Sequence, residues 1–274
     1  MTQHHPAAIP DDLSAAGIQG HLHAGPFGRS LTVAASTDST NRQLAHMAEA
    51  GAPEGAVLVA ETQTAGRGRM ERTWFSPPGL NLYFSLLLRP SVDPALATTL
   101  PLLCGVVMAR AVEQAAPELR AQIKWPNDLW LDSKKVCGVL CEMGAEAGGL
   151  RHVVVGIGLN VNLPRARLPK LLASTATSLR MAAGRTFDRA ALMADILNLF
   201  DAAYQQWLKE GLAPFLPEIA ARDVLRGKQI AIEQHGGVLA GTADGVMPDG
   251  SLRLVLPDGT VQNILAGDAH IRSV

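Results

Sequence analysis

Cysteine is scarce in this sequence: only Cys104, Cys137 and Cys141 occur in 274 residues. An odd number of cysteines inside apolar segments is typical of reduced, buried thiols in an intracellular protein, which excludes a disulfide-stapled fold. No further ligand pair completes a zinc pattern, and the eight histidines show no ligand spacing. Residues 156–162 lack the third glycine of a dinucleotide fingerprint, which excludes a Rossmann site. Structural roles are therefore favoured over a metal centre for the cysteines.

Net charge, a membrane span and a leader segment are also lacking. The 24 Lys and Arg residues nearly cancel the 25 Asp and Glu residues, so no broad basic field exists to bind nucleic acid non-specifically. The most apolar helix candidate, 100–109, is broken by Pro101 and is too short to cross a bilayer. The N-terminus has no basic stretch followed by an apolar one, so no signal peptide is expected. These absences predict a cytoplasmic protein without membrane contact.

Three regions of the chain differ in texture. Residues 1–30 are rich in Pro, His, Ala and Gly without periodicity, so we expect a loosely ordered extension. Residues 31–222 combine apolar strand-like runs with helical segments, among them one opened by Asp93-Pro94 and one capped by Asp188. Residues 223–274 contain short alternating runs separated by Gly-Gly and Pro-Asp-Gly turns, which predict a small antiparallel β-barrel. The sequence thus predicts a mixed α+β domain followed by a β domain.

The densest cluster of chemistry is the loop 65–74, which contains Arg67, Arg69 and Arg72 together with two glycines. Apolar runs on either side predict buried strands that hold its ends. Glycine lets the backbone approach a ligand closely, and arginine presents a planar fork to carboxylate or phosphate. The loop therefore indicates a small anionic ligand, with a solvated basic turn as the alternative. Repelling arginines give it little internal order, so we expect it to be mobile without ligand.

Other polar residues stand at the ends of predicted elements. Ser39, Thr40 and Asn41 begin a predicted helix, where hydroxyl and amide groups cap the helix, bind a polar ligand, or do both. Lys124 ends a predicted strand at a proline-fixed bend, and Lys135 precedes a buried strand. These residues are further candidates for a site.

Six stretches, taken in order, resemble the biotin protein ligase family. They are Asp38-Ser39-Thr40-Asn41, Gln63 through Arg69, Trp74 through Pro77 with Asn81-Leu82, Lys124 through Asp128, Lys134 through Gly138, and Gly158-Leu159-Asn160. The resemblance implies a class II synthetase-like mixed sheet flanked by helices, followed by an SH3-like β-barrel. It also implies that ATP and Mg²⁺ activate biotin to biotinyl-5′-AMP with release of pyrophosphate. Biotin then passes to a lysine of a biotin carboxyl carrier protein.

The resemblance assigns roles residue by residue. Lys135 and Arg69 are the catalytic residues that it implies, and Asp128 is the candidate Mg²⁺ ligand. The residues implied to bind biotin are Ser39, Thr40, Asn41, Gln63, Gly66, Arg67, Gly68, Arg69, Lys135 and Gly138. Those implied to bind ATP or the adenylate are Arg67, Arg69, Arg72, Trp74, Lys124, Asn127, Lys135 and Asn160.

Elementary electrostatics suits these roles, since a carboxylate must approach a polyphosphate of the same sign. At about 4 Å each unit-charge repulsion is worth about 4 kcal/mol at an effective dielectric of about 20, so several fixed cations are needed. Lys135 has the alternative of a solvated lysine beside Lys134. Asp128 has the alternative of bracing its bend through backbone amides. Trp125 and Trp130 are assigned to the core.

Two departures from the family pattern limit what the resemblance implies. Thirty largely structureless residues cannot form the N-terminal helix-turn-helix of many members, so neither DNA binding nor repression is expected. Met70 and Glu71 stand where some relatives carry Arg-Gly, which predicts weaker retention of the adenylate. A lipoate or octanoyl ligase and a non-catalytic biotin-binding module are the alternative functions. Ser39, Thr40 and Gln63 favour a polar ureido head over a dithiolane, and the intact Lys135 argues for catalysis. A homodimer is left open.

Overall fold

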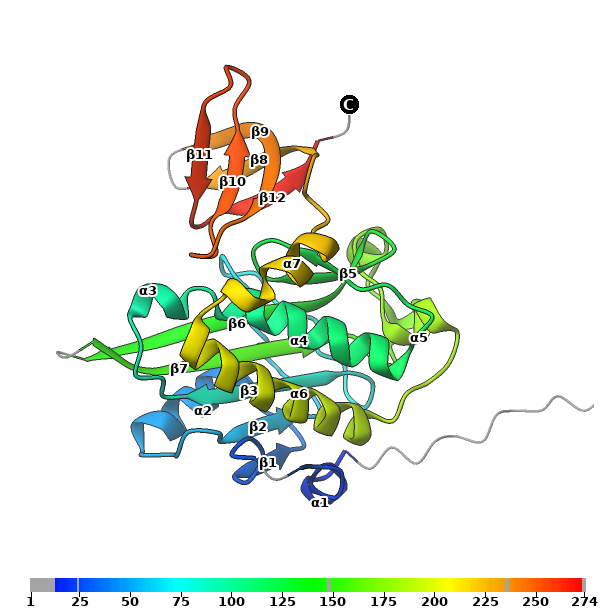
Figure 1. Ribbon diagram of the computed structural model, residues 1–274. Helices are drawn as coiled ribbons and strands as arrows, with labels where there is room; N and C mark the ends of the chain where they lie inside the picture. The colour runs from blue at the N-terminus through cyan, green and yellow to red at the C-terminus, as the bar shows by residue number, and fades with distance from the viewer. Residues whose placement is uncertain (1–12, 24, 147–148, 235–236, 273–274) are drawn as a thin grey trace, which may run out of the picture.

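A seven-stranded mixed sheet forms the centre of the protein in the computed structural model, which describes residues 13–23, 25–146, 149–234 and 237–272 (Figure 1). Its strands are β1 (Leu31–Ala34), β2 (Val57–Ala60), β3 (Leu82–Leu88), β4 (Gln122–Lys124), β5 (Asp128–Leu131), β6 (Lys134–Glu146) and β7 (Gly149–Leu159). Across the sheet the order is β1-β2-β3-β7-β6-β5-β4. The β1–β2 pair is parallel, and the other neighbours are antiparallel.

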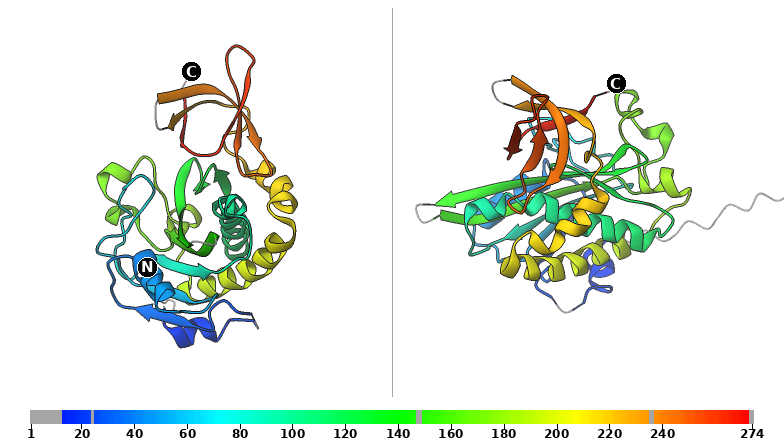
Figure 2. Two further views of the ribbon diagram at one scale, coloured as in Figure 1. Left: turned by 90° about the vertical axis from the view of Figure 1, so that its left-hand side faces the viewer. Right: turned by 45° about the horizontal axis from the view of Figure 1, so that its top comes forward.

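Helices cover both faces of this sheet. They are α1 (Ala15–Gln19), α2 (Thr40–Glu49), α3 (Pro94–Ala97), α4 (Leu100–Ala115), α5 (Leu179–Ala183), α6 (Arg189–Glu210) and α7 (Leu216–Arg222), with short 3₁₀ turns at Arg165–Arg167, Lys170–Leu172 and Ala213–Phe215. In the end-on view of Figure 2, α4 and α6 lie on one face and α2 lies on the other. Every residue of β3 is buried, which explains why this strand reads as a continuous apolar run.

Helix α6 agrees with the sequence prediction, whereas the one long helix expected from Asp93-Pro94 is divided into the short α3 and the long α4. Asp188 caps α6 by accepting hydrogen bonds from the N–H groups of Ala190 and Ala191. The expected break at Pro101 is wrong, because this proline lies in the first turn of α4, where a missing N–H costs no helical hydrogen bond. The segment Pro94–Ala115 is long and apolar enough to cross a membrane, but 72% of its most apolar window is buried inside the protein. It is a core helix.

Residues 13–23 and 25–30 are not the loosely ordered extension that we expected. Helix α1 packs on α6 and buries Ile18 completely. Phe27 is also buried, and its ring centroid lies 5.0 Å from that of Phe200 in an edge-to-face contact. Two isolated apolar anchors leave no periodic signal, which is why composition suggested disorder. Residues 1–12 lie outside the described residues.

The C-terminal region forms a second, antiparallel sheet. Its strands are β8 (Gln229–Gln234), β9 (Gly237–Val246), β10 (Leu252–Val255), β11 (Val261–Ile264) and β12 (Asp268–Ile271), in the order β11-β10-β9-β8-β12. Figure 1 shows it standing above the large sheet, and its buried residues continue the main core. The predicted fold class is therefore confirmed: a mixed α+β domain followed by a small β domain. The sequence did not predict β12. We propose that the division falls at the end of α7, between 31–222 and 223–274.

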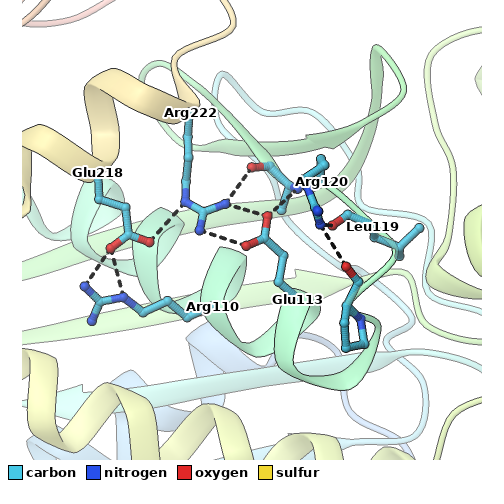
Figure 3. A network of polar contacts seen from close by, with 8 residues as sticks. Arg110, Glu113, Leu119, Arg120, Glu218 and Arg222 are labelled. Atoms are coloured by element: carbon cyan, nitrogen blue, oxygen red, sulfur yellow. Dashed lines mark hydrogen bonds and ion pairs between the residues drawn. The ribbon is translucent and has the colours of Figure 1, made fainter.

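A network of ion pairs holds α7 to α4 just before this division (Figure 3). Arg222 contacts Glu113 at 2.6 Å and Glu218 at 3.0 Å. Glu218 in turn pairs with Arg110 of α4 at 2.6 Å. The hydrogen bond from Arg222 lowers the pKa of Glu113 below its usual value. These contacts fix the last helix before the small sheet and so help to set where that sheet lies.

Candidate active site

A cavity of about 400 Å³ lies where loop 65–74, the N-terminus of α2 and strands β5 to β7 meet β12 of the small sheet. The structure brings nearly all the predicted site residues to this one cavity. Those that line it are Ser39, Thr40, Asn41, Gln63, Arg67, Gly68, Arg69, Arg72, Trp74, Lys124, Asn127, Asp128, Lys135, Gly138 and Asn160.

The exception is Gly66, which shapes the loop and is not among the lining residues, so its predicted contact with biotin stays a prediction. A Cβ on Gly66 would lie 2.7 Å from the carbonyl oxygen of Trp74, so only glycine permits this approach. Trp74 N–H donates to Gly66 O at 2.9 Å, and Gly68 N–H donates to Arg72 O at 2.7 Å. The loop is thus a small hairpin, with more internal order than the sequence led us to expect.

One part of the cavity wall is neutral and polar. Gln63 Oε1 accepts hydrogen bonds from Thr40 N–H at 2.9 Å and Thr40 Oγ1 at 3.2 Å. Ser85 Oγ lies 2.8 Å from Thr40 Oγ1 and 2.7 Å from Asn41 Oδ1. Ser39 precedes α2, but its side chain makes no capping hydrogen bond. Ser39, Thr40, Asn41 and Ser85 are nearly fully buried and Gln63 is half-buried, so the wall has a fixed pattern of donors and acceptors before any ligand enters.

Lys135 lies in a second, charged part of the wall. Its Nζ is 2.6 Å from Asp128 Oδ1 and 5.3 Å from the centroid of the Trp74 ring. Gly138 and Gly158 are partners across the β6–β7 ladder. A Cβ on Gly138 would lie 2.9 Å from the Trp74 ring, and one on Gly158 would lie 2.4 Å from it. The two glycines therefore create the slot that holds this indole beside Lys135.

Strand β12 contributes Asp268 to the same cluster of charges. Arg72 forms an ion pair with Asp268 Oδ2, and Lys124 Nζ lies 3.8 Å from Oδ1. Burial opposes ionisation of Asp268, but the hydrogen bond from Arg72 and the charge of Lys124 lower its pKa overall. Burial lowers the pKa of Lys124 below its usual value. Asp268 thus compensates two cations that the sequence predicted for ATP.

Arg69 is held differently, by neutral acceptors. Its guanidinium donates to Asn127 Oδ1 at 3.1 Å and to Gly267 O at 3.2 Å, and burial lowers its pKa. Asn127 Nδ2 also donates to a β6 carbonyl at 2.6 Å. Asn160 Oδ1 accepts from Asn81 Nδ2 at 3.3 Å, and its own Nδ2 bonds a backbone carbonyl at 3.0 Å. Both asparagine side chains brace the wall, and their predicted contacts with nucleotide stay predictions.

Several cavity residues were missed by sequence reasoning. Assigning Trp130 to the core was incomplete, because it also lines the cavity, with Lys124 Nζ 5.5 Å from its ring centroid. Trp125 is in the core as predicted. A glycine repeat inside the apolar strand β7 signals close approach and could have revealed Gly156 and Gly158. Lining residues with no such signal include Asp268, His270, Leu163, Leu168, Leu172, Thr175 and Ala176.

No metal centre of protein ligands alone exists in the described part of the chain, where no group of three or more His, Cys, Asp and Glu could hold an ion. Mg²⁺ commonly needs only one or two carboxylates beside substrate phosphates, so Asp128 fits such an ion as a single ligand. Its role as a ligand stays a prediction. Burial raises the pKa of Cys137 to about 12, which keeps this thiol protonated and suits the structural role predicted for it.

The cavity therefore joins a neutral hydrogen-bonding wall to five arginine and lysine side chains, which exceed the two lining aspartates and Glu142, the partner of Arg67, by two charges. Such an excess of fixed cations offsets the repulsion between two anionic groups. The fold and the site define a class: a domain that brings a substrate with a neutral polar head and an anionic tail to a phosphate-bearing partner.

Comparison with known proteins then identifies the family. Residues 33–160 match the Biotin/lipoate A/B protein ligase family. The chain is 36% identical over 264 residues to the bifunctional ligase/repressor BirA of Bacillus subtilis, covering 96% of this chain and 80% of that protein. It is 32% identical to the biotin–[acetyl-CoA-carboxylase] ligase of Mycobacterium tuberculosis, with 92% of each covered. The biotin protein ligase from Aquifex aeolicus in complex with biotin and ATP superposes with a TM-score of 0.77 at 29% identity, covering 90% of this chain and 100% of that one. The chain belongs to the biotin protein ligase family.

Proposed function

We propose that this protein is an ATP-dependent biotin–protein ligase. A carboxylate oxygen of biotin attacks the α-phosphorus of ATP, which forms biotinyl-5′-AMP and releases pyrophosphate. The amine of an acceptor lysine then attacks the acyl carbon, loses a proton and displaces AMP. The observation that carries the proposal is the single cavity in which Thr40 and Gln63 adjoin Lys135 and Arg69. The names of the relatives, including a solved ligase with biotin and ATP, support the same reaction.

The neutral wall is the proposed site for the ureido head of biotin. A ureido group offers both donors and an acceptor, which suits the buried hydroxyls of Ser39 and Thr40 and the amide of Gln63. A dithiolane has neither donors nor strong acceptors, so it would form no such hydrogen bonds with these groups. This contrast favours biotin over lipoate as the substrate.

The charged wall is the proposed site of the reacting anions. Lys135 exchanges its partner Asp128 for the biotin carboxylate and the α-phosphate, and so lowers the repulsion between them. Arg69 is bonded to neutral acceptors, which leaves its charge for the phosphate. Trp74 Nε1 has no hydrogen-bond partner among the described residues, and an acceptor on the nucleotide would satisfy it.

Mg²⁺ is the proposed metal: Asp128 would hold it as one ligand beside ATP, and the ion would supply charge that neutralises the phosphates. The proposed acceptor is a lysine on the biotin carboxyl carrier of a carboxylase, as the printed name of the Mycobacterium tuberculosis relative suggests. The absence of DNA and membrane partners and the cytoplasmic location stay predictions, and the homodimer remains open.

A biotin-dependent assay tests this proposal. The full chain is incubated with ATP, Mg²⁺ and labelled biotin, with and without a carrier domain. We expect pyrophosphate release that requires biotin, followed by acid-stable label on one carrier lysine. Release with lipoate but not with biotin would assign the chain to the other branch of the family. Tight biotin binding in calorimetry without any turnover would make it a binding module.

A further inference from the structure

Glu142 on β6 does not line the cavity, but it contacts two residues that do. Its Oε1 lies 2.8 Å from Nη1 of Arg67 in loop 65–74. Its Oε2 accepts a hydrogen bond from Nδ2 of Asn41 at 2.8 Å. One carboxylate therefore joins the arginine loop to the N-terminus of α2, two segments far apart in the sequence.

Asn41 gives this carboxylate a rigid anchor. Its side chain is buried, and Nδ2 also donates to Leu140 O at 3.1 Å. Its Oδ1 lies 2.7 Å from Ser85 Oγ, which contacts Thr40 in turn. A Cβ on Gly156 would lie 1.9 Å from this Oδ1, so only glycine on β7 leaves room for the amide. An unbroken polar chain therefore leads from the neutral wall through Asn41 to Glu142.

We propose that Glu142 is a positioning residue that aims the guanidinium of Arg67 at the biotin end of the cavity, an inference that rests on the proposed function. Arg67 is 44% exposed, and a long exposed side chain has many rotamers to lose on binding. Because Glu142 balances its charge, Arg67 acts there as a directed hydrogen-bond donor. The charged cluster at the ATP end has its own carboxylates, Asp128 and Asp268. The effect of Glu142 is therefore confined to biotin.

Steady-state kinetics of three variants of the full chain test this role: Glu142→Gln, Arg67→Ala and the double variant. Glutamine keeps an acceptor for Asn41 but loses the charge that holds Arg67. We expect the KM for biotin and the Kd from calorimetry to rise about fivefold in Glu142→Gln, equivalent to about 1 kcal/mol for a partly exposed pair. The KM for ATP and the melting temperature should not change. In the Arg67→Ala background, Glu142→Gln should have no further effect.

Glu210→Gln is the matched control, since it removes one exposed carboxylate at the far end of α6 and should alter neither KM. Two results would overturn the inference: additive effects in the double variant, or a joint rise of both KM values with a lower melting temperature, which is the signature of a structural role. A wild-type chain that releases no pyrophosphate with biotin refutes the proposed function, and the inference falls with it. Turnover by the wild type with an additive cycle refutes the inference alone.

Discussion

The two parts of the cavity wall hold their side chains by different means. In the neutral part, Thr40 bonds to Gln63 and, behind the cavity lining, to Ser85, over 2.8 to 3.2 Å. In the charged part, Lys135 and Arg72 are held by the carboxylates of Asp128 and Asp268. Neutral groups that already bond one another keep their positions when a ligand enters, whereas ion pairs must open before their cations reach a phosphate. The groups that recognise the ligand are therefore in place before it binds, whereas the catalytic cations must exchange their carboxylate partners for the reacting anions.

The largest effect of a change in the charged part of the wall is expected at Lys135. Lys135→Ala should lower biotin-dependent pyrophosphate release about a thousandfold, because about 4 kcal/mol of charge stabilisation at 4 Å is lost. Single-turnover quench experiments measure this rate, and circular dichroism should show an unchanged fold. Lys134→Ala is the matched control, since the neighbouring Nζ reaches only a backbone carbonyl at 3.5 Å. A rate for Lys135→Ala within tenfold of the wild type would remove this lysine from the mechanism.

A second test uses the one arginine of the charged part that has neutral partners. Arg69→Ala should release the bound adenylate about 10- to 100-fold faster, through loss of charge-assisted bonds worth about 1.5–3 kcal/mol. The dissociation rate of labelled biotinyl-5′-AMP measures the effect. Arg253→Ala is the control: this arginine lies on β10 of the small sheet, is paired with Asp244 and does not line the cavity, so the rate should be unchanged. Equal retention in Arg69→Ala and the wild type would contradict the role of Arg69.

Gly158→Ala tests whether the Trp74 indole, held in the slot formed by Gly138 and Gly158, contributes to the binding of ATP rather than of biotin. The new Cβ would lie 2.4 Å from the Trp74 ring, so the indole must move away from Lys135. We expect the KM for ATP to rise about tenfold, because overpacking of this kind costs about 1–3 kcal/mol. Gly105→Ala on α4 is the control, as its Cβ would meet nothing closer than 3.6 Å. A larger rise in the KM for biotin than for ATP would contradict the role of the indole in ATP binding.

The smallest expected effect is on the stability of the protein, and it comes from the ion pairs between α4 and α7, which lie outside the cavity. The pKa of Glu113 is lowered by its hydrogen bond with Arg222. The stabilisation is therefore fully present above the usual glutamate pKa of 4.5 and is lost as the pH falls towards the lowered value. Urea unfolding should show Glu113→Gln less stable than the wild type by about 1 kcal/mol at pH 7, and the gap should close at low pH. Glu118→Gln, which removes an exposed pair at 3.6 Å, should show a smaller difference. A gap that is constant with pH would contradict the assignment.

Much of the fold was predictable, because its signals are local. The apolar run of β3 and the capped, periodic α6 can each be recognised from the residues of one stretch of sequence. Strand β12 has only four residues and exists because it pairs with β8, whose partner residues lie 35 to 41 positions earlier, a contact that no local pattern encodes. The order of residues 13–23 and 25–30 was not predicted for the same reason, since Ile18 and Phe27 are anchored by α6 far along the chain.

The candidate site shows the same limit. Residues inside dense motifs, such as Arg69 and Lys135, were identified from sequence because their neighbours carried the resemblance. Glu142 and Asp268 were not identified, because each is placed at the site by an ion pair with an arginine of loop 65–74, which is distant in the sequence. The loop also differs from our expectation. Internal hydrogen bonds order its hairpin although Glu71, at φ 58°, occupies a left-handed conformation that glycine adopts more readily.

A crystal structure of the protein with biotinyl-5′-AMP tests the central claim most directly. The account predicts that Thr40, Gln63 and Ser85 keep their present contacts, while Lys135 leaves its 2.6 Å contact with Asp128 to bind the phosphate together with Arg69. An adenylate bound while Lys135 remains paired with Asp128 and the guanidinium of Arg69 points to solvent would contradict it.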